Sequence, residues 1–364
     1  MIRIPVTTPS RSYEVLIGSG LLGRAGESLG NLIGGRKAFV VTVPPVRRRW
    51  AKVLVQSLTA AEIGTTLLEM PDGECAKRLA TLEKLAEQLV KKGADRGATL
   101  IALGGGVVGD VTGFLASTYM RGVDVIQVPT TVLAQVDAAI GGKTGVNLVS
   151  GKNLLGTFHQ PRAVLVDPAV LATLPAREYR AGLYESLKCG IIGDAGLFRL
   201  FEERHKEILA RDPAVVEKVI ADSVRLKASV VSADERESGL RQVLNLGHTI
   251  GHALEAETGY KLLLHGEAVG WGLLAATHIA LSTGKLDSVT AGRIMNSVLG
   301  LGELPRMKVQ TANIMKRLKF DKKTRQGVVH FILPREIGKV EITSDVSAEV
   351  VRAAVEEIRK LARN

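Results

Sequence analysis

Three histidines and one glutamate have the residue types that a metal centre requires. His248 and His252 stand four residues apart in RQVLNLGHTIGHALE, so on a helix they would share one face, and His265 follows in LHGEAVGWG. A divalent metal with nitrogen and oxygen ligands needs two or three side chains and an open position for a substrate oxygen. Glu185 in GLYESLKCG could supply the carboxylate, with Lys188 one turn further along the same face. No Glu follows His248, so this is not the H-E-x-x-H metalloprotease signature.

A purely structural role is the alternative for these residues. The histidines could be ordinary helix residues, and Glu185 with Lys188 could be a surface pair at i,i+3 spacing, which contributes roughly 0.2 to 0.5 kcal/mol. A single histidine would favour that interpretation. Three of the seven histidines of the chain fall within one short stretch, and this clustering favours a metal site.

A second candidate site is the glycine-rich stretch LGGGVVGDV, residues 103–111. Its glycines at 104, 106 and 109 satisfy G-x-G-x-x-G, and it lies between a strand pattern and a helix pattern. The backbone amides of such a turn can face a pyrophosphate. However, the next strand pattern, VDVIQVP, ends without the acidic residue that holds a ribose about twenty positions on. Glycines that serve only a tight strand-to-helix turn would explain the motif about equally well.

Polar residues crowd the segment that follows, PTTVLAQVDAAIGGKTGVNLVSGKNLLGTFHQP. We expect surface loop chemistry here, because a core element could not use so many polar groups on a glycine-rich backbone. Lysines beside glycines suit phosphate or carboxylate binding, each as a mobile point charge. One lysine alone would more simply be solvated, but the cluster favours an anion site. Its polar members are Thr130, Thr131, Asp137, Lys143, Lys152 and Asn153.

The elements that must position these residues fall into two kinds. Strand patterns at 37–43, 65–70, 98–103 and 124–129 alternate with helical patterns at 46–58, 79–93 and 111–120. Such a βαβ series predicts a mostly parallel, doubly wound sheet. In the helix at 79–93, Leu82, Leu85, Leu89 and Val90 form the apolar face. After residue 178 long amphipathic patterns dominate, and strand signals return only in VVHFILP and KVEIT. The fold class predicted is an α/β Rossmann-like domain over 1–178 and a mainly α-helical domain over 179–364.

Composition narrows the class of protein. A chain of 364 residues suits two domains, since single cores stop growing near about 250 to 300 residues. A net charge of +11 could indicate nucleic-acid binding, but the basic residues are dispersed and do not alternate with aromatics. Cys75 and Cys189 lie far apart without a partner motif, which indicates a reducing compartment. With no leader pattern and no long apolar run, we expect a cytoplasmic protein that binds neither membrane nor nucleic acid.

Nine segments in order resemble one family nearly end to end. They are PDGECAK, GGGVVGD, STYMRGVD, VPTTVLAQVDAAIGGKTGVN, GKNLLGTFHQP, GLYESLKCG, DERESGLRQVLNLGHTIGHALE, HGEAVGWG and DKKTRQG. On these segments the chain resembles the 3-dehydroquinate synthases, which are sugar phosphate cyclases. The resemblance implies that residues 1–178 bind NAD, that residues 179–364 bind metal and substrate, and that the protein is a homodimer.

The resemblance also implies roles for individual residues. Glu185, His248 and His265 would bind zinc or cobalt. NAD would contact Asp72, Gly73, Glu74, Lys77, Gly105, Gly106, Val107, Val108, Gly109, Asp110, Thr130, Thr131, Lys143, Lys152 and Thr173. Substrate binding and catalysis would involve Arg121, Asp137, Lys143, Lys152, Asn153, Lys188, Lys227, Arg241, Asn245, His252 and Lys322 or Lys323 of DKK.

The implied reaction converts 3-deoxy-D-arabino-heptulosonate 7-phosphate to 3-dehydroquinate and phosphate, a lyase step of the shikimate pathway. Val43 stands where the family commonly has an Asp, which affects one adenosine-side contact, and Tyr184 and Cys189 are smaller departures. Other cyclases that make valiolone or scyllo-inosose rings, and metal-dependent polyol dehydrogenases, are alternatives. The segments LNLGHTIGHA and GKNLLGTFHQP favour dehydroquinate synthase over both.

Overall fold

The computed structural model describes residues 1–35, 37–320 and 329–363. The chain forms two compact units. The first comprises Met1–Leu174 and Val216–Arg236, and the second comprises Pro175–Val215 and Glu237–Asn364. The return of residues 216–236 to the first unit follows no boundary signal in the sequence. The division at residue 178 stays a prediction.

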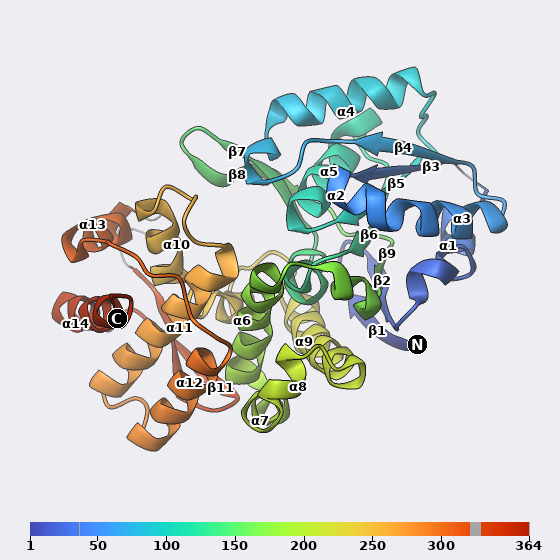
Figure 1. Cartoon of the computed structure of the whole chain (residues 1–364). Coiled ribbons are helices and arrows are strands. Elements are labelled where there is room, and N and C mark those ends of the chain that lie inside the picture. Colours follow the sequence, from blue (N-terminus) through green and yellow to red (C-terminus); the bar gives the residue numbers. More distant parts are fainter. Residues whose placement is uncertain (36, 321–328, 364) are drawn as a thin grey trace. The chain divides into compact units, whose positions relative to one another are not determined.

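A seven-stranded sheet forms the centre of the first unit, in the order β1-β2-β9-β6-β5-β3-β4 (Figure 1). All its neighbouring strands are parallel except β1 and β2. The predicted parallel, doubly wound sheet is therefore confirmed. Its elements and those beside it are β1 (Ile2–Thr7), β2 (Ser12–Ile17), α1 (Ala25–Ile33), β3 (Ala38–Thr42), α2 (Pro44–Val46), α3 (Lys52–Ala60), β4 (Thr65–Glu69), α4 (Leu79–Lys91), β5 (Thr99–Gly104), α5 (Gly106–Thr118), β6 (Asp124–Pro129), β9 (Ala163–Val166) and α9 (Pro213–Ala233).

Helices cover both faces of this sheet, which explains why its central strands are apolar without interruption. Along β5, Leu100 packs into a core with α4 and α5, while its neighbour Ile101 packs into a second core with α1 and α3. Successive side chains of a strand point to opposite faces, so a strand buried on both sides needs apolar residues at every position. In α4, Leu85 and Leu89 are buried as predicted, but Val90 is 59% exposed, so its assignment to the apolar face was wrong. Helical spacing placed Val90 at the margin of that face, where the packing of neighbouring elements determines whether a side chain is buried.

The polar, glycine-rich segment after β6 differs from the surface loop expected there. Much of it is not a loop but an antiparallel hairpin of β7 (Lys143–Leu148) and β8 (Gly151–Phe158). Gly145 and Gly156 lie opposite each other in the register. A Cβ on Gly156 would lie 1.9 Å from the Thr144 carbonyl oxygen, so the glycines allow two backbones to approach closely. The segment therefore uses its glycines for pairing as well as for turns.

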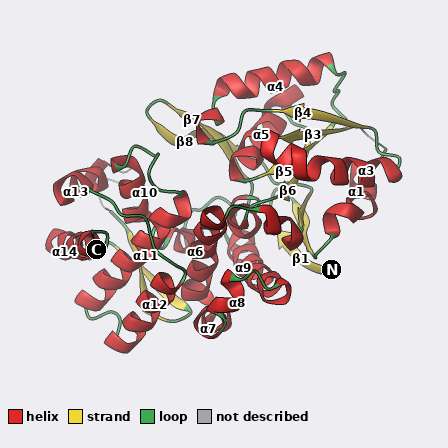
Figure 2. Cartoon of the chain, viewed as in Figure 1, coloured by secondary structure: helices red, strands yellow, loops and turns green. Residues whose placement is uncertain are grey.

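The second unit is mainly helical, as predicted, and its described residues include a two-stranded sheet (Figure 2). The strands predicted in VVHFILP and KVEIT are present as β10 and β11, and they pair antiparallel to form this sheet. The bounds are α6 (Ala176–Gly193), α7 (Ala195–Glu203), α8 (His205–Leu209), α10 (His248–Glu257), α11 (His265–Ser282), α12 (Ser288–Gly300), α13 (Thr311–Phe320), β10 (Phe331–Glu336), β11 (Lys339–Thr343) and α14 (Ala348–Leu361).

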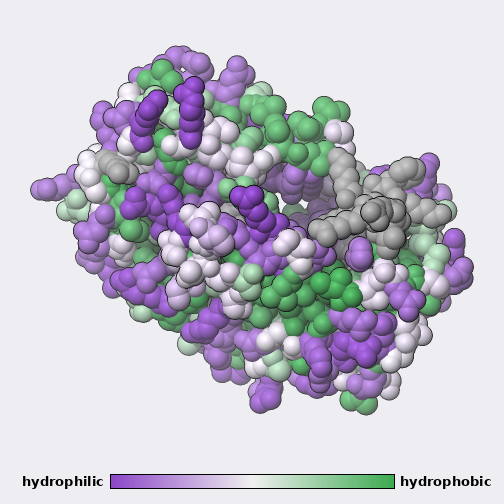
Figure 3. Space-filling view, turned by 180° about the vertical axis from the view of Figure 1, so that it is seen from behind, coloured by the Kyte–Doolittle hydropathy of each residue, from purple (hydrophilic) through white to green (hydrophobic). Residues whose placement is uncertain are grey.

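Hydrophilic and hydrophobic residues are interspersed on the face of the molecule in Figure 3. Within the described ranges, none of the helices combines the length and apolar character needed to cross a bilayer.

Candidate functional site

Glu185, His248 and His265 come together within the second unit. They lie on α6, α10 and α11 respectively, and one ligand atom from each falls within 4.8 Å of the others. The Nε2 atoms of His248 and His265 lie 3.6 and 3.5 Å from Oε1 of Glu185. His252, one turn along α10 from His248, places its ring 5.9 Å from the ring of His265. The shared helix face expected for the two α10 histidines is therefore present.

Glycines bring the three helices close enough for this convergence. A Cβ on Gly266, which follows His265, would lie 1.7 Å from the carbonyl oxygen of Ala181, one turn before Glu185. A Cβ on Gly272 of α11 would lie 1.8 Å from the carbonyl oxygen of Gly247, the residue before His248. No Cβ fits at either separation, so α11 touches α6 and the start of α10 through backbone atoms. This close approach sets the spacing of the three side chains.

The environment of Glu185 is strongly polar although the residue is fully buried. Its Oε2 accepts a hydrogen bond from the ammonium of Lys188, which is 1% exposed, so the surface-pair alternative is wrong for these two residues. Burial alone would raise the pKa of Glu185, but the charge of Lys188 and the contact with His265 lower it to about 2. Burial alone would lower the pKa of His265, but the carboxylates of Glu185 and Glu255 raise it to about 10. The cluster thus holds a carboxylate that stays charged.

These residues fit a divalent metal. Oε1 of Glu185 is buried and makes no hydrogen bond within the described part of the chain. A buried carboxylate oxygen normally has a hydrogen-bond partner, and a cation bound between this atom and the two nearby imidazole nitrogens would take that place. Two imidazole nitrogens and one carboxylate oxygen are a ligand set typical of catalytic zinc, which keeps a further position open.

Glu255 is a residue at this site that the sequence analysis missed. Its Oε2 lies 3.2 Å from Nδ1 of His265, and its side chain is buried. It follows His248 by seven residues and His252 by three, so the helical spacing in HTIGHALE could have indicated it.

The glycine-rich stretch lies in the first unit at the carboxyl end of β5, where the sheet order reverses between β3 and β5. Ligands of open α/β sheets bind at such switch points. Gly105 precedes α5, and no side chain caps this helix in the described structure, so the first-turn amides can serve an anion. Gly104 pairs with Pro129 of β6, and a Cβ on Gly105 would lie 3.1 Å from the Thr131 side chain. The glycine turn and the two threonines are therefore adjacent, and these residues fit a dinucleotide phosphate.

Lys77 connects several of the predicted cofactor and substrate residues. It is buried, and its ammonium donates to Asp110 of α5 and to Asn153 of β8. Burial raises the pKa of Asp110 more than Lys77 lowers it. Asn147 of β7, also missed in the sequence, accepts from the Asn153 amide at 2.9 Å and donates to Glu74 at 2.7 Å. The start of α5, the hairpin and the segment 72–77 thus form one hydrogen-bonded network.

The other predicted residues have varied surroundings. In the first unit, Lys227 donates to the carboxylate and the carbonyl oxygen of Asp137. In the second unit, Asn245 donates to Glu237, and Arg241 is buried. Arg121, which follows α5, is exposed and has a φ of 69°, and Lys143 is the first residue of β7. The ammonium of Lys152 lies 4.0 Å from the carboxylate of Glu74, and the Thr173 hydroxyl accepts a hydrogen bond from the Trp50 indole at 3.1 Å. Val43 is buried in the core beside α4 and α5. Lys322 and Lys323 lie outside the described residues.

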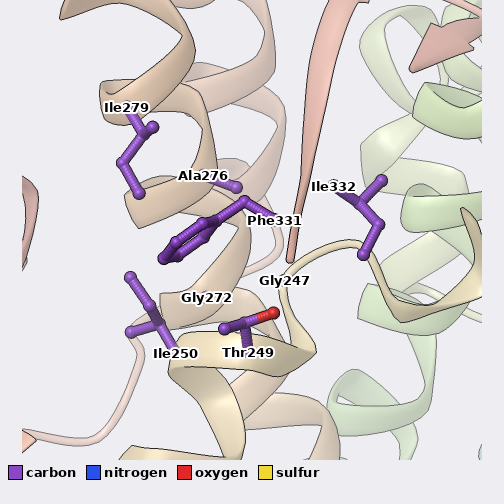
Figure 4. Close-up of a pocket in the computed structure, with 8 residues that line it drawn as sticks. All are labelled: Gly247, Thr249, Ile250, Gly272, Ala276, Ile279, Phe331 and Ile332. Carbon is purple, nitrogen blue, oxygen red and sulfur yellow. The ribbon is translucent and has the colours of Figure 1, made fainter. Parts of the chain in front are cut away.

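An apolar pocket lies beside the first turn of α10 (Figure 4). Ile250, Ile279 and Phe331 point into it, and none of its eight labelled residues has an ionisable side chain. The pocket therefore offers no acid, base or metal ligand, whereas the cluster around Glu185 offers all three kinds of group.

Comparisons with known proteins agree over almost the whole chain. Residues 67–181 match the family described as 3-dehydroquinate synthase N-terminal, and residues 182–324 match 3-dehydroquinate synthase C-terminal. A curated 3-dehydroquinate synthase from Koribacter versatilis (strain Ellin345) is 55% identical over 362 residues, which cover 99% of each chain.

Solved structures of related cyclases share the fold. A 2-epi-5-epi-valiolone synthase from Streptomyces hygroscopicus subsp. jinggangensis 5008, with NAD+ and Zn2+ bound, has a TM-score of 0.89 and 31% identity over 96% of this chain and 98% of its own. A 2-deoxy-scyllo-inosose synthase with carbaglucose-6-phosphate, NAD+ and Co2+ has a TM-score of 0.82 and 26% identity over 99% of both chains.

Proposed function

Because the chain belongs to the 3-dehydroquinate synthase family, we propose that the residues described above carry out that family's reaction in this protein. The enzyme converts 3-deoxy-D-arabino-heptulosonate 7-phosphate to 3-dehydroquinate and phosphate, and it uses NAD and a divalent metal, zinc or cobalt. Another sugar phosphate cyclase activity is not favoured, because identity to the valiolone synthase is 31% against 55% to the dehydroquinate synthase.

The observation that carries the assignment of roles is the convergence of Glu185, His248 and His265. These three residues would hold the metal. When bound, the metal would supply Lewis acidity at a substrate hydroxyl, and NAD would supply a reversible hydride acceptor for the carbon that carries it.

Side chains around the metal ligands bind and orient the substrate in this proposal. Lys188 keeps a buried positive charge beside Glu185, which suits an anionic substrate group. His252 and Asn245 present polar groups from α10 and from the turn before it. Holding one substrate in reacting geometry through several steps can lower a barrier by roughly 7 to 11 kcal/mol.

Residues of the first unit bind the cofactor and contribute further substrate contacts in this proposal. The uncapped start of α5 would hold the pyrophosphate of NAD, with Thr130 and Thr131 beside it. Lys77 keeps Asp110 and Asn153 in place through its two hydrogen bonds. Lys152 and Asn153 would bind the phosphate of the substrate, and Lys227 would orient Asp137.

We further propose a homodimer and a cytoplasmic location. The resemblance to the family supports the dimer, and the biosynthetic role of the relatives supports the location. Light scattering of the purified protein at several concentrations tests the dimer.

The test of the function is an assay of purified protein with the heptulosonate phosphate, NAD and zinc. We expect phosphate release with many turnovers per NAD, and no accumulation at the NADH absorbance band, because the hydride is returned. Stoichiometric NADH accumulation would identify a dehydrogenase instead. No phosphate release from protein that has bound the metal would refute the synthase assignment.

A further inference from the structure

The carboxylate of Glu255 lies close to a metal-ligand candidate but on the other side of its ring. Oε2 of Glu255 is 3.2 Å from Nδ1 of His265, while Nε2 of the same ring is 3.5 Å from Oε1 of Glu185. The imidazole of His265 is therefore held between two carboxylates. Glu255 is only 2% exposed, and a carboxylate is rarely so buried without partners.

The second histidine of the cluster is held in the same way but by a weaker acceptor. Nδ1 of His248 lies 3.1 Å from the carbonyl oxygen of Leu246. In both rings the acceptor beside Nδ1 holds a proton on that nitrogen, so Nε2, which faces Glu185, is the nitrogen left to bind a metal. The acceptor is a neutral carbonyl for His248 and a carboxylate for His265. A carboxylate on the far nitrogen fixes the tautomer and the ring orientation, and it makes the imidazole a stronger ligand.

A second metal ion is the competing explanation. His252, Glu255 and His265 also place one ligand atom each within 4.8 Å of one another. That arrangement would need the Nδ1 lone pair of His265, whereas the separation of 3.2 Å from Glu255 is that of a hydrogen bond donated by Nδ1–H. One nitrogen cannot do both. Since Nε2 of the same ring faces Glu185 and would bind the proposed metal, Nδ1 is the nitrogen that keeps its proton and donates it to Glu255.

We propose that Glu255 is a positioning residue, which orients His265 and strengthens its Nε2 as a metal ligand without binding the metal itself. This inference rests on the proposed metal site. If Glu255 has this role, its replacement should weaken metal binding even in protein that is not turning over substrate.

The experiment compares Glu255→Gln with a matched control, Glu257→Gln. Gln keeps the volume and an acceptor oxygen at residue 255 but removes the charge. Glu257 lies on the same helix and accepts from Asn313 and Arg317 at 2.7 and 2.8 Å, so its replacement removes an equal charge outside the cluster. Metal-free protein is titrated with Zn2+ against a chromophoric chelator, and the visible absorption of the Co2+ form is recorded.

We expect Glu255→Gln to bind Zn2+ about tenfold more weakly than wild type and to shift the Co2+ bands, because one ligand has become a weaker donor. Glu257→Gln should match wild type in both measurements. Glu255→Asp keeps the charge and should bind Zn2+ more tightly than Glu255→Gln. This second variant also tests the role of the charge if the first does not fold.

Two results would overturn the inference. One is wild-type affinity and an unchanged Co2+ spectrum in Glu255→Gln. The other is wild-type protein that binds two equivalents of Zn2+ while Glu255→Gln binds one, since Glu255 would then be a ligand of a second ion. Wild type that binds no Zn2+ would instead contradict the proposed metal site.

Discussion

Glu185 is the residue on which the proposed metal site depends most directly. Its two carboxylate oxygens have different surroundings, since one accepts from Lys188 and the other faces Nε2 of both histidines. The carboxylate is fully buried, yet its pKa is lowered to about 2, because Lys188 and His265 outweigh the burial. It therefore stays charged at neutral pH and can bind a cation without first losing a proton.

Glu185→Ala is expected to lose the metal and the activity while it still binds NAD. The reason is that the proposed cofactor residues are in the other compact unit. Metal analysis after gel filtration and NAD titration by fluorescence give the two measurements. Full activity in this variant would refute the ligand role.

The contacts between helices, more than any side chain, set the geometry of the cluster. Gly266→Ala is expected to destabilise the fold by about 1 to 3 kcal/mol and to weaken metal binding, because its Cβ would meet the Ala181 carbonyl at 1.7 Å. Urea unfolding and Zn2+ titration measure the two effects. Gly292→Ala on α12 is the control, since no atom lies within 4 Å of its Cβ. It should stabilise by about 0.4 to 1 kcal/mol, and equal effects of the two variants would contradict the argument.

Within the first unit, a buried carboxylate joins the segment after α9 to the residues around β1 and β8. Glu235 accepts hydrogen bonds from Thr8 at 3.1 Å, from Gln160 at 2.9 Å and from the side chain of Ser10. Burial would raise the pKa of Glu235, but these hydrogen bonds outweigh it and hold the pKa below the ordinary value of 4.5. The charged form is thus favoured by folding.

A carboxyl group whose pKa is lowered by folding stabilises the protein above its unfolded pKa, and this contribution is lost as the pH falls through the folded pKa. We therefore expect Glu235→Gln to lose about 1 kcal/mol or more at neutral pH. The difference from wild type should shrink as the pH falls from about 6 to about 3. Denaturant unfolding across this range tests the effect, with Glu83→Gln at an exposed position of α4 as control. A difference that does not change with pH would contradict the role of the charge.

At the scale of the whole molecule, the candidate residues for the two cofactors lie in different compact units. The metal candidates lie in Pro175–Val215 and Glu237–Asn364, and the NAD candidates lie in Met1–Leu174. A ligand stabilises the structure that binds it, by about 2.7 kcal/mol at a hundredfold excess over its Kd.

Hydrogen exchange should therefore separate the two effects. Zn2+ is expected to slow exchange chiefly in α6, α10 and α11, and NAD chiefly at the start of α5 and the end of β6. Mass spectrometry of peptides from the metal-free protein with each ligand alone makes the comparison. Protection of the same peptides by both ligands would contradict the separation.

Patterns of neighbouring residues were enough to predict much of this protein. The strand-helix alternation before residue 130, the glycine turn before α5 and the shared face of His248 and His252 depend on spacing along one element, so the sequence alone determined them. The residue types and the order of the nine motifs likewise predicted the family, which the comparisons confirm.

Only the tertiary structure decided which distant groups meet. Glu185 lies more than sixty positions before His248, and their contact depends on backbone approaches at Gly266 and Gly272 that no periodicity reveals. The same holds for the β7–β8 pairing, for the exposure of Val90 and for Glu255 opposite Nδ1 of His265. Spacing determines which side of an element a residue occupies, whereas the partner on that side depends on how separate elements pack.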